Sequence, residues 1–315
     1  MGKSISINHA LPACPICGGC SFSSVLENCR DIVCGCPGNW SLVECNQCNL
    51  IFTLPQLNPE KLLSFYPPEY GSNNPIGELR SHPIGNLLWH VAMLPYTLRF
   101  GSPDWADEPF NKMRLLDIGC GAGMFLKKAL NLGWNCFGID INPIVVQKAR
   151  INAPGAKLWA ATLNDLGEEE KYDLINISHV LEHLPNPYQA LNKCFCLLNP
   201  KGKMRICVPN IGSAEAKAFG RYWRGLDVPR HLAHFRPDMI SHIMCEIGFA
   251  NINIRPQMLA SSISESITLL MPKSLRYRFL NARNARLLYL SLVFPASLSY
   301  MLGNAGSIEV TANRP

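Results

Sequence analysis

Alternating strand and helix patterns between residues 111 and 258 restrict the fold of this chain more than any other feature of its sequence. Short apolar runs alternate there with segments whose apolar residues recur at helical spacing. This alternation is typical of a mostly parallel sheet with helices on both faces, so we predict an α/β, Rossmann-like domain. The predicted strands are residues 113–118, 135–139, 157–160, 172–177, 202–208 and 250–255, and the predicted helices are 124–132, 143–151, 187–198 and 239–247.

A glycine-rich turn joins the first predicted strand to the first predicted helix. It reads Leu-Asp-Ile-Gly-Cys-Gly-Ala-Gly over residues 116–123, and a strand before it with a helix after it is the context of a nucleotide-binding turn. Gly119 allows a sharp turn, Gly121 leaves room for a ligand beside the backbone, and Gly123 lets the helix approach closely. The G-x-G-x-G spacing is tighter than the G-x-G-x-x-G of dinucleotide-binding folds.

Two carboxylates accompany this turn. Asp117 ends the first strand, where it can accept a hydrogen bond from the ammonium of an amino-acid-like ligand but would repel a pyrophosphate. Asp140 ends the second strand, close to the spacing of about 20 residues at which an acid binds ribose hydroxyls. The pair therefore favours S-adenosylmethionine over NAD, and the alternative is an ordinary glycine turn beside a solvated aspartate.

Four motifs in order carry a resemblance to a known family. LLDIGCGAG, GIDINP, YDLINISHVLEHLPNP and LNPKGKMRICVPN resemble class I S-adenosylmethionine-dependent methyltransferases, particularly the ubiquinone-biosynthesis-like branch, from residue 113 to about 249. The resemblance implies a seven-stranded sheet whose last strand, with residues 307–312 as the candidate, is antiparallel. It also implies contacts of the glycine loop with the methionine part of the cofactor, of Asp140 with the ribose, and of Thr162 and Leu163 with the adenine. Many relatives carry an acidic residue near the positions of Thr162 and Leu163. The expected cofactor-binding residues are Asp117, Gly119, Cys120, Gly121, Ala122, Gly123, Asp140, Ile141, Thr162, Leu163, Ser178 and His179.

A His-Val-Leu-Glu-His run follows the fourth predicted strand at residues 179–183. The carboxyl ends of parallel strands face the ligand crevice, so this run is well placed for chemistry. His183 can act as a general base on an acceptor hydroxyl, because an ordinary histidine pKa is about 6.5. His179, Glu182 and His183 can instead hold a divalent metal ion. A third reading is that Glu182 and His183 cap the next helix or stabilise the fold.

A second polar cluster lies between Trp223 and Phe235, after the fifth predicted strand. A similar W-x-G-x-D-x-P-R-H-x-x-H-F segment occurs in cell-surface-polysaccharide and ubiquinone-like methyltransferases. The segment can fold over the crevice as a lid, with His231 as a catalytic candidate and Arg224 or Arg230 holding an acceptor phosphate or carboxylate. The alternative is a hydrogen-bonded structural loop. The catalytic candidates of the whole chain are His183, His231 and Glu182.

Eight of the 14 cysteines lie within the first 48 residues. Cys14 with Cys17, and Cys45 with Cys48, form two C-x-x-C knuckles, and four thiolates suit one tetrahedral structural zinc ion. The gap between the knuckles exceeds the usual 15 to 20 or so residues, which fits a ribbon with a long hairpin. Two uncoordinated knuckles are the alternative. The resemblance implies only these two knuckles, so the other four cysteines, Cys20, Cys29, Cys34 and Cys36, leave a second site or an iron–sulfur cluster open.

The chain divides in this reading into five parts. They are a Cys-rich zinc-ribbon-like module (1–55), a linker with a helical segment (56–110), the Rossmann-like core (111–258), a basic and apolar helical insert (259–303) and the last strand of the core (304–315). The N-terminal sequence lacks the apolar stretch of a signal peptide, so we expect a cytoplasmic protein. The apolar stretch 287–302 is shorter than the roughly 20 residues that span a bilayer, and basic residues precede it from Lys273 to Arg286. Residues 273–302 therefore suit either peripheral contact with the inner membrane face or a buried insert.

These features predict an enzyme that transfers a methyl group to an oxygen or carbon of a small or lipid-linked metabolite, of the sugar or quinone-precursor type. A ribosomal-RNA methyltransferase with an RNA-binding ribbon is the second reading. Residues 1–55 contain only Lys3 and Arg30 as basic residues, and no Asn-Pro-Pro-Tyr motif follows the fourth strand, so a nucleic-acid partner is disfavoured. A cofactor-binding scaffold without catalysis is the third. Fold analogy does not identify the acceptor, and the sequence leaves the oligomeric state open.

Overall fold

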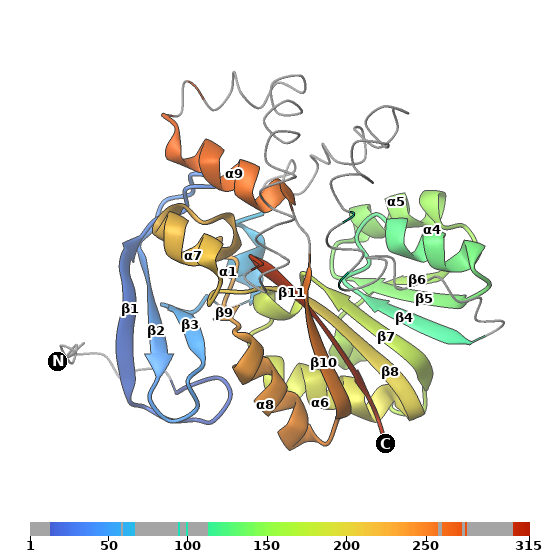
Figure 1. The fold of residues 1–315 in the computed structure, drawn as a ribbon. Helices are drawn as coiled ribbons and strands as arrows, with labels where there is room; N and C mark the ends of the chain where they lie inside the picture. Colours follow the sequence, from blue (N-terminus) through green and yellow to red (C-terminus); the bar gives the residue numbers. More distant parts are fainter. Residues whose placement is uncertain are drawn as a thin grey trace. The chain divides into compact units, whose positions relative to one another are not determined.

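The computed structural model describes residues 13–57, 59–66, 113–257, 260–272 and 305–315, together with Leu94, Arg99 and Leu275. The chain forms two compact units. Unit 1 comprises Met1–Pro103, Pro209–Pro237 and Arg255–Ile308, and unit 2 comprises Asp104–Val208, Asp238–Ile254 and Glu309–Pro315. Each unit is built around a sheet of its own (Figure 1).

A seven-stranded sheet of order β10-β11-β8-β7-β4-β5-β6 forms the frame of unit 2. The strands β4, β5, β6, β7 and β8 pair in parallel along this order. Arg314 N donates to Gly202 O at one end of β11, and Asn210 N donates to Gly306 O at the other, so β11 runs antiparallel to β8. The strands are β4 (Arg114–Ile118), β5 (Asn135–Asp140), β6 (Lys157–Ala160), β7 (Tyr172–Ser178), β8 (Leu198–Pro209), β10 (Ala250–Gln257) and β11 (Ser307–Asn313).

Helices cover both faces of this sheet. The helices α4 (Met124–Asn131) and α5 (Pro143–Asn152) lie on one face, and α6 (Pro187–Leu197) and α8 (Pro237–Ile247) lie on the other (Figure 1). Asn142 caps α5 by accepting a hydrogen bond from Ile144 N at 3.0 Å, and Pro143 occupies the first helical position. Buried side chains of α4 and α5 pack on those of β4, β5 and β6 in one apolar core. The predicted α/β fold with its antiparallel last strand is therefore confirmed.

Unit 1 contains a four-stranded sheet of order β1-β2-β3-β9, in which neighbouring strands are antiparallel. Its strands are β1 (Phe22–Cys29), β2 (Trp40–Cys45), β3 (Ile51–Leu54) and β9 (Ala233–His234). The helices described in this unit are α1 (Pro59–Leu63), α7 (Ala214–Phe219) and α9 (Ala260–Leu270), with short 3-10 turns η3 (Gly220–Tyr222) and η4 (Arg224–Leu226). Trp40 and Ile51 share a buried core with Trp223 and Val228, so the segment 223–235 packs with the N-terminal strands.

Two predicted regions lie largely outside the described residues. They are the linker with its helical segment (56–110), described at 56–57, 59–66, Leu94 and Arg99, and the basic and apolar residues 273–302, described at Leu275. Within the ranges given above, the structure contains no helix with the length and apolar character needed to cross a membrane. The predicted membrane contact of 273–302 stays a prediction.

Candidate functional site

The glycine loop between β4 and α4 has one open position and two crowded ones. Gly119 has φ +70°, and a Cβ there would lie 2.2 Å from Val180 Cγ2. Gly123 has φ +78°, and a Cβ there would lie 3.0 Å from the Cα of Ala149 on α5. Gly121 has φ +52°, and a Cβ built on it meets no atom within 4 Å. Gly119 and Gly123 are therefore required by packing and backbone conformation, whereas the backbone at Gly121 leaves room for a ligand.

Asp140, at the end of β5, braces this loop. Its Oδ2 accepts from Gly121 N at 3.1 Å, and its Oδ1 accepts from Asn142 N at 2.9 Å. An ionised carboxylate offers about four acceptor positions, so Asp140 retains capacity for two further donors. Paired ribose hydroxyls are donors of the kind that this remaining capacity suits. The neighbouring Ile141 is 53% exposed and is available to an apolar ligand surface.

Asp117, at the carboxyl end of β4, is buried. Its Oδ1 accepts from Asn176 Nδ2 on β7 at 2.6 Å. Burial raises the pKa of Asp117 to about 7, because the hydrogen bond from Asn176 and the charge of Arg205 offset only part of the desolvation. A buried carboxylate in this condition gains from a further cationic donor, such as a ligand ammonium.

Asn176, Arg205 and Glu309 are polar residues that sequence reasoning missed. Arg205 Nη1 donates to Asn176 Oδ1 at 2.7 Å, and Arg205 Nε donates to Glu309 Oε2 at 2.8 Å. The sequence contains a usable signal for them, because Arg205 stands among Met204, Ile206, Cys207 and Val208, and Glu309 stands between Ile308 and Val310. Charged residues inside otherwise apolar strands indicate a buried pair.

The loop after β6 forms the expected adenine side. Thr162 donates from both its backbone nitrogen and its Oγ1 to Asp165 Oδ2, each at 2.7 Å, and Leu163 is buried beside it. These hydrogen bonds lower the pKa of Asp165. Sequence reasoning did not single out Asp165, which is the acidic residue of this region and holds Thr162 in place.

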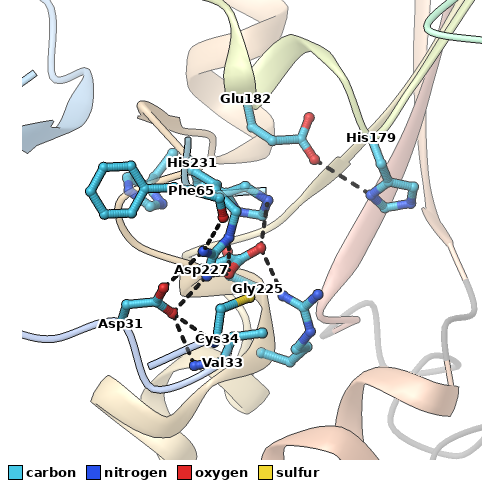
Figure 2. A network of polar contacts seen from close by, with 12 residues as sticks. Asp31, Val33, Cys34, Phe65, His179, Glu182, Gly225, Asp227 and His231 are labelled. Carbon is cyan, nitrogen blue, oxygen red and sulfur yellow. Dashed lines mark hydrogen bonds and ion pairs between the residues drawn. The ribbon is translucent and has the colours of Figure 1, made fainter. Parts of the chain in front are cut away.

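The run after β7 combines a strained backbone with a buried acid. His179 has φ +55°, its backbone nitrogen donates to Cys207 O at 2.8 Å, and its Nδ1 lies 3.5 Å from Glu182 Oε1 (Figure 2). Glu182 and His183 form the 3-10 turn η2 (Leu181–His183), and Glu182 is buried. Asn186 caps α6 by accepting from Gln189 N at 2.9 Å, so the reading in which Glu182 or His183 caps that helix is wrong.

The sequence model of the family described as "Methyltransferase domain" matches residues 92–254, which is more than half of the chain. The protein belongs to this family. The family prediction made from the four motifs is confirmed, and the catalytic roles of individual residues stay predictions.

The chain is similar to curated proteins named ubiquinone biosynthesis O-methyltransferase, of which two are described. The relative from Chelativorans sp. (strain BNC1) is 33% identical over 163 residues, which cover 47% of this chain and 63% of the relative. The relative from Cereibacter sphaeroides (strain ATCC 17025) is 35% identical over 107 residues, which cover 32% and 43%. The chain therefore spans less than two thirds of the length of these relatives.

Solved structures that are similar to this chain include phosphoethanolamine N-methyltransferase 2 of Haemonchus contortus, with a TM-score of 0.46 and 16% identity. That match covers 78% of this chain and 61% of the other. A likeness of this size carries no information on the substrate, so the acceptor has to be argued from other observations.

Arg230 is fully buried in unit 1 and binds the carboxylates of Asp31 and Asp227, which Figure 2 labels. Its Nη2 lies 2.7 Å from Asp31 Oδ1 and 2.6 Å from Asp227 Oδ1, and its Nη1 donates to Phe65 O at 3.0 Å. Arg224 Nη1 lies 3.0 Å from Asp227 Oδ2. The guanidinium of Arg230 is therefore occupied inside the unit. This agrees with the alternative given in the sequence analysis, in which the segment 223–235 is a hydrogen-bonded structural loop.

His231, the predicted catalytic histidine of this segment, is also buried in unit 1. Its Nδ1 lies 2.8 Å from Gly225 O, and its Nε2 lies 4.0 Å from Asp227 Oδ2. Contacts on both ring nitrogens orient the imidazole. A direct role of His231 with the acceptor stays a prediction.

The two C-x-x-C knuckles have the same local geometry. Gly18 N donates to Cys14 O at 3.0 Å, and Asn49 N donates to Cys45 O at 2.8 Å, so Gly18 and Asn49, both with positive φ, end equivalent turns. The Sγ atoms are 3.5 Å apart in the pairs Cys14–Cys48 and Cys17–Cys45, and all four lie within 4.8 Å. Tetrahedral zinc with bonds of about 2.3 Å spaces its sulfurs about 3.8 Å apart, so this donor set fits zinc.

The other four N-terminal cysteines do not join this cluster. Cys29 is buried and Cys20 is exposed. The backbone nitrogens of Cys34 and Cys36 donate to the carboxylate of Asp31, at 2.9 and 3.3 Å. Among the described residues they form no second group of metal ligands, so the reading of a second site or an iron–sulfur cluster receives no support from the structure.

Proposed function

We propose that this methyltransferase transfers a methyl group from S-adenosylmethionine to a hydroxyl oxygen of a small quinone-precursor-like molecule. The observation that carries the proposal is the open backbone at Gly121 between Asp117 and Asp140. The names of the curated relatives support oxygen as the atom methylated and an aromatic quinone precursor as the acceptor. The proposal is narrower than the oxygen or carbon acceptor predicted from the sequence.

Each of the proposed cofactor-binding residues contacts a different part of the ligand. Asp117 accepts from the ligand ammonium, the backbone from Gly119 to Gly123 lines the methionine part, and Asp140 accepts from the ribose hydroxyls. Thr162, braced by Asp165, and the buried Leu163 border the adenine. The sulfonium of S-adenosylmethionine supplies an already activated methyl group, so the protein has mainly to align the acceptor and remove one proton.

His183 is the proposed base for the acceptor hydroxyl, because a neutral imidazole has a nitrogen lone pair that can accept its proton. The buried carboxylate of Glu182 lies 3.5 Å from His179 Nδ1 and helps to orient the His179 ring beside this run. Replacement of His183 by Ala is expected to reduce turnover about 100- to 10,000-fold and to leave cofactor affinity unchanged, which single-turnover rates and calorimetry separate.

Zinc is proposed as a structural ion held by Cys14, Cys17, Cys45 and Cys48. A four-cysteine site has no open coordination position, so the ion stabilises unit 1 and does not bind the acceptor. A lipid-linked acceptor would call for the membrane contact predicted for residues 273–302, and a small acceptor does not.

Calorimetric titration of S-adenosylhomocysteine into the protein tests the cofactor assignment. We expect micromolar binding that weakens about 10- to 100-fold in Asp140→Ala, because charge-assisted hydrogen bonds to the ribose are lost. The matched control is Glu168→Ala, which removes an exposed carboxylate of the same unit and should bind as the wild type does. A folded wild type that binds nothing overturns the proposal. Methylation of phenolic acceptors is measured by mass spectrometry. If the protein binds S-adenosylhomocysteine but methylates no phenolic acceptor, the proposed acceptor class is wrong.

A further inference from the structure

Four polar side chains form a row across adjacent strands of unit 2, and we call them the polar row. They are Asp117 on β4, Asn176 on β7, Arg205 on β8 and Glu309 on β11, strands that are neighbours in the sheet. Asp117 is in register with Asn176, and Asn176 is in register with Arg205. Register partners point to the same face of a sheet, so the row lies on one face. Each member is at most 8% exposed.

Hydrogen bonds within the polar row start from Arg205 and run both ways along it. Arg205 donates to Glu309 and to Asn176 Oδ1, and Asn176 Nδ2 donates to Asp117. An amide carries its acceptor on one side and its donors on the other. Because the guanidinium engages Oδ1, the NH2 group of Asn176 must face the carboxylate. Arg205 therefore fixes the orientation in which Asn176 supports Asp117.

Charge in the polar row is unevenly shared. Arg205 Nη2 lies 2.5 Å from Glu309 Oε2, whereas Asp117 receives its hydrogen bond from a neutral amide and senses Arg205 only at longer range. Asp140 on β5 also acts on Asp117, as a like charge that raises its pKa. The nearby thiols of Cys120 and Cys136 have pKa values raised to about 12 and stay neutral. Asp117 thus depends on one shared cation.

We propose that Arg205 and Glu309 are positioning residues that set the charge and orientation of Asp117 for the ammonium of S-adenosylmethionine, acting through Asn176. This rests on the proposed function, since it assumes that Asp117 receives that ammonium. Neither positioning residue needs to touch the ligand. Their effect reaches it through one amide and through the electrostatic potential at Asp117.

Loss of the Arg205 charge and loss of the Glu309 charge should shift the pH dependence of ligand affinity in opposite directions. Burial raises the pKa of Asp117 to about 7, so affinity for an ammonium ligand falls as the pH drops below that value, by up to about tenfold per pH unit. Loss of the Arg205 charge raises this pKa further and moves the fall in affinity to higher pH. Loss of the Glu309 charge leaves Arg205 less neutralised, which lowers the pKa and moves the fall to lower pH.

Calorimetric titration of S-adenosylhomocysteine from about pH 6 to about pH 8 tests the proposal, because the carboxylate titrates in that window. The variants are Arg205→Met/Glu309→Met, Glu309→Gln and Arg205→Lys. The double variant replaces the ion pair by apolar side chains, which buried pairs often tolerate, whereas Arg205→Met alone would strand a buried charge. Arg205→Lys retains the cation and should stay near the wild-type profile.

The expected result is a profile displaced to higher pH in Arg205→Met/Glu309→Met and to lower pH in Glu309→Gln. At neutral pH the double variant should bind several-fold more weakly, with recovery at higher pH. The control ligand is 5′-methylthioadenosine, which lacks the ammonium and should bind all variants alike at every pH. If the folded variants bind S-adenosylhomocysteine with the same pH profile as the wild type, the proposal is overturned and the proposed function is unaffected. Failure of the wild type to bind S-adenosylhomocysteine overturns the proposed function itself.

Discussion

Asp227 in unit 1 and Asp117 in unit 2 are both buried carboxylates, but the charges around them differ. Burial alone would raise the pKa of Asp227, yet the charges of Arg224, His231 and Arg230 outweigh it and hold that pKa well below its usual range. Asp117 accepts from the neutral amide of Asn176, and burial raises its pKa to about 7. One carboxylate is compensated by protein cations, and the other is compensated only in part.

This difference separates a structural polar cluster from a binding one. Arg230 joins Asp31 near the N-terminus to Asp227 some 200 residues later in the chain, and its donors are used within unit 1. A cluster that is complete in this way leaves no buried charge uncompensated and gains little from a ligand. Asp117 stands beside an open glycine loop and gains from an added cation. A buried acid that is short of positive charge is therefore the better marker of a binding site.

Removal of the metal should have the largest effect on unit 1. Chelation, or Cys45→Ala, should abolish binding of one zinc ion per chain and remove hydrogen-exchange protection from β1 and β2. Structural zinc contributes on the order of 10 kcal/mol in small modules. The matched control is Cys20→Ser, which changes an exposed cysteine outside the cluster and should keep its zinc in elemental analysis. Unchanged protection after chelation would show that the unit does not depend on this closed site.

Arg230→Met should lower the stability of unit 1 by about 3–5 kcal/mol, because it removes the guanidinium that two buried carboxylates share. Exchange of the β2 and β3 amides, followed by mass spectrometry, measures the loss. The matched control is Arg236→Met, which breaks the partly exposed pair with Glu44 and should cost at most about 1 kcal/mol. Equal losses in the two variants would remove the distinction between a compensated cluster and an ordinary ion pair.

The pH dependence of stability should have opposite sign for the two carboxylates. Between about pH 4 and 7, folded Asp117 binds a proton that its unfolded form does not, so unit 2 gains stability as the pH falls. The gain is at most about 1.4 kcal/mol per pH unit. The depressed pKa of Asp227 instead contributes stability above the unfolded value near 3.8, which is lost as the pH falls through the folded pKa.

Hydrogen exchange of the β4 and β7 amides at several pH values measures the Asp117 contribution. Asp117→Asn should remove the gain between about pH 4 and 7, while the exposed Glu168→Gln should retain it. A wild-type slope of the opposite sign would contradict the assignment of Asp117 as an undercompensated acid.

Much of unit 2 could be predicted because its signals are local. The strands β4, β5, β6 and β7 are short apolar runs, and their observed ends lie within one residue of the predicted ends. The glycine loop and the cysteine knuckles were found for the same reason, since each is encoded in a few consecutive residues. Local patterns could not reveal β9, two residues whose pairing with β3 joins positions about 180 residues apart.

The sequence by itself determined the alternation of strands and helices, the family, and the residues that turn the chain at Gly119, Gly123 and the two knuckles. Each of these follows from periodicity or backbone conformation over a short span. Only the tertiary structure decided which buried charges are compensated. Arg230 and Arg205 look alike as isolated basic residues, but one binds two carboxylates and the other leaves Asp117 short of positive charge. Burial and pairing are properties of groups that are distant in sequence, so they exist only once the chain has folded.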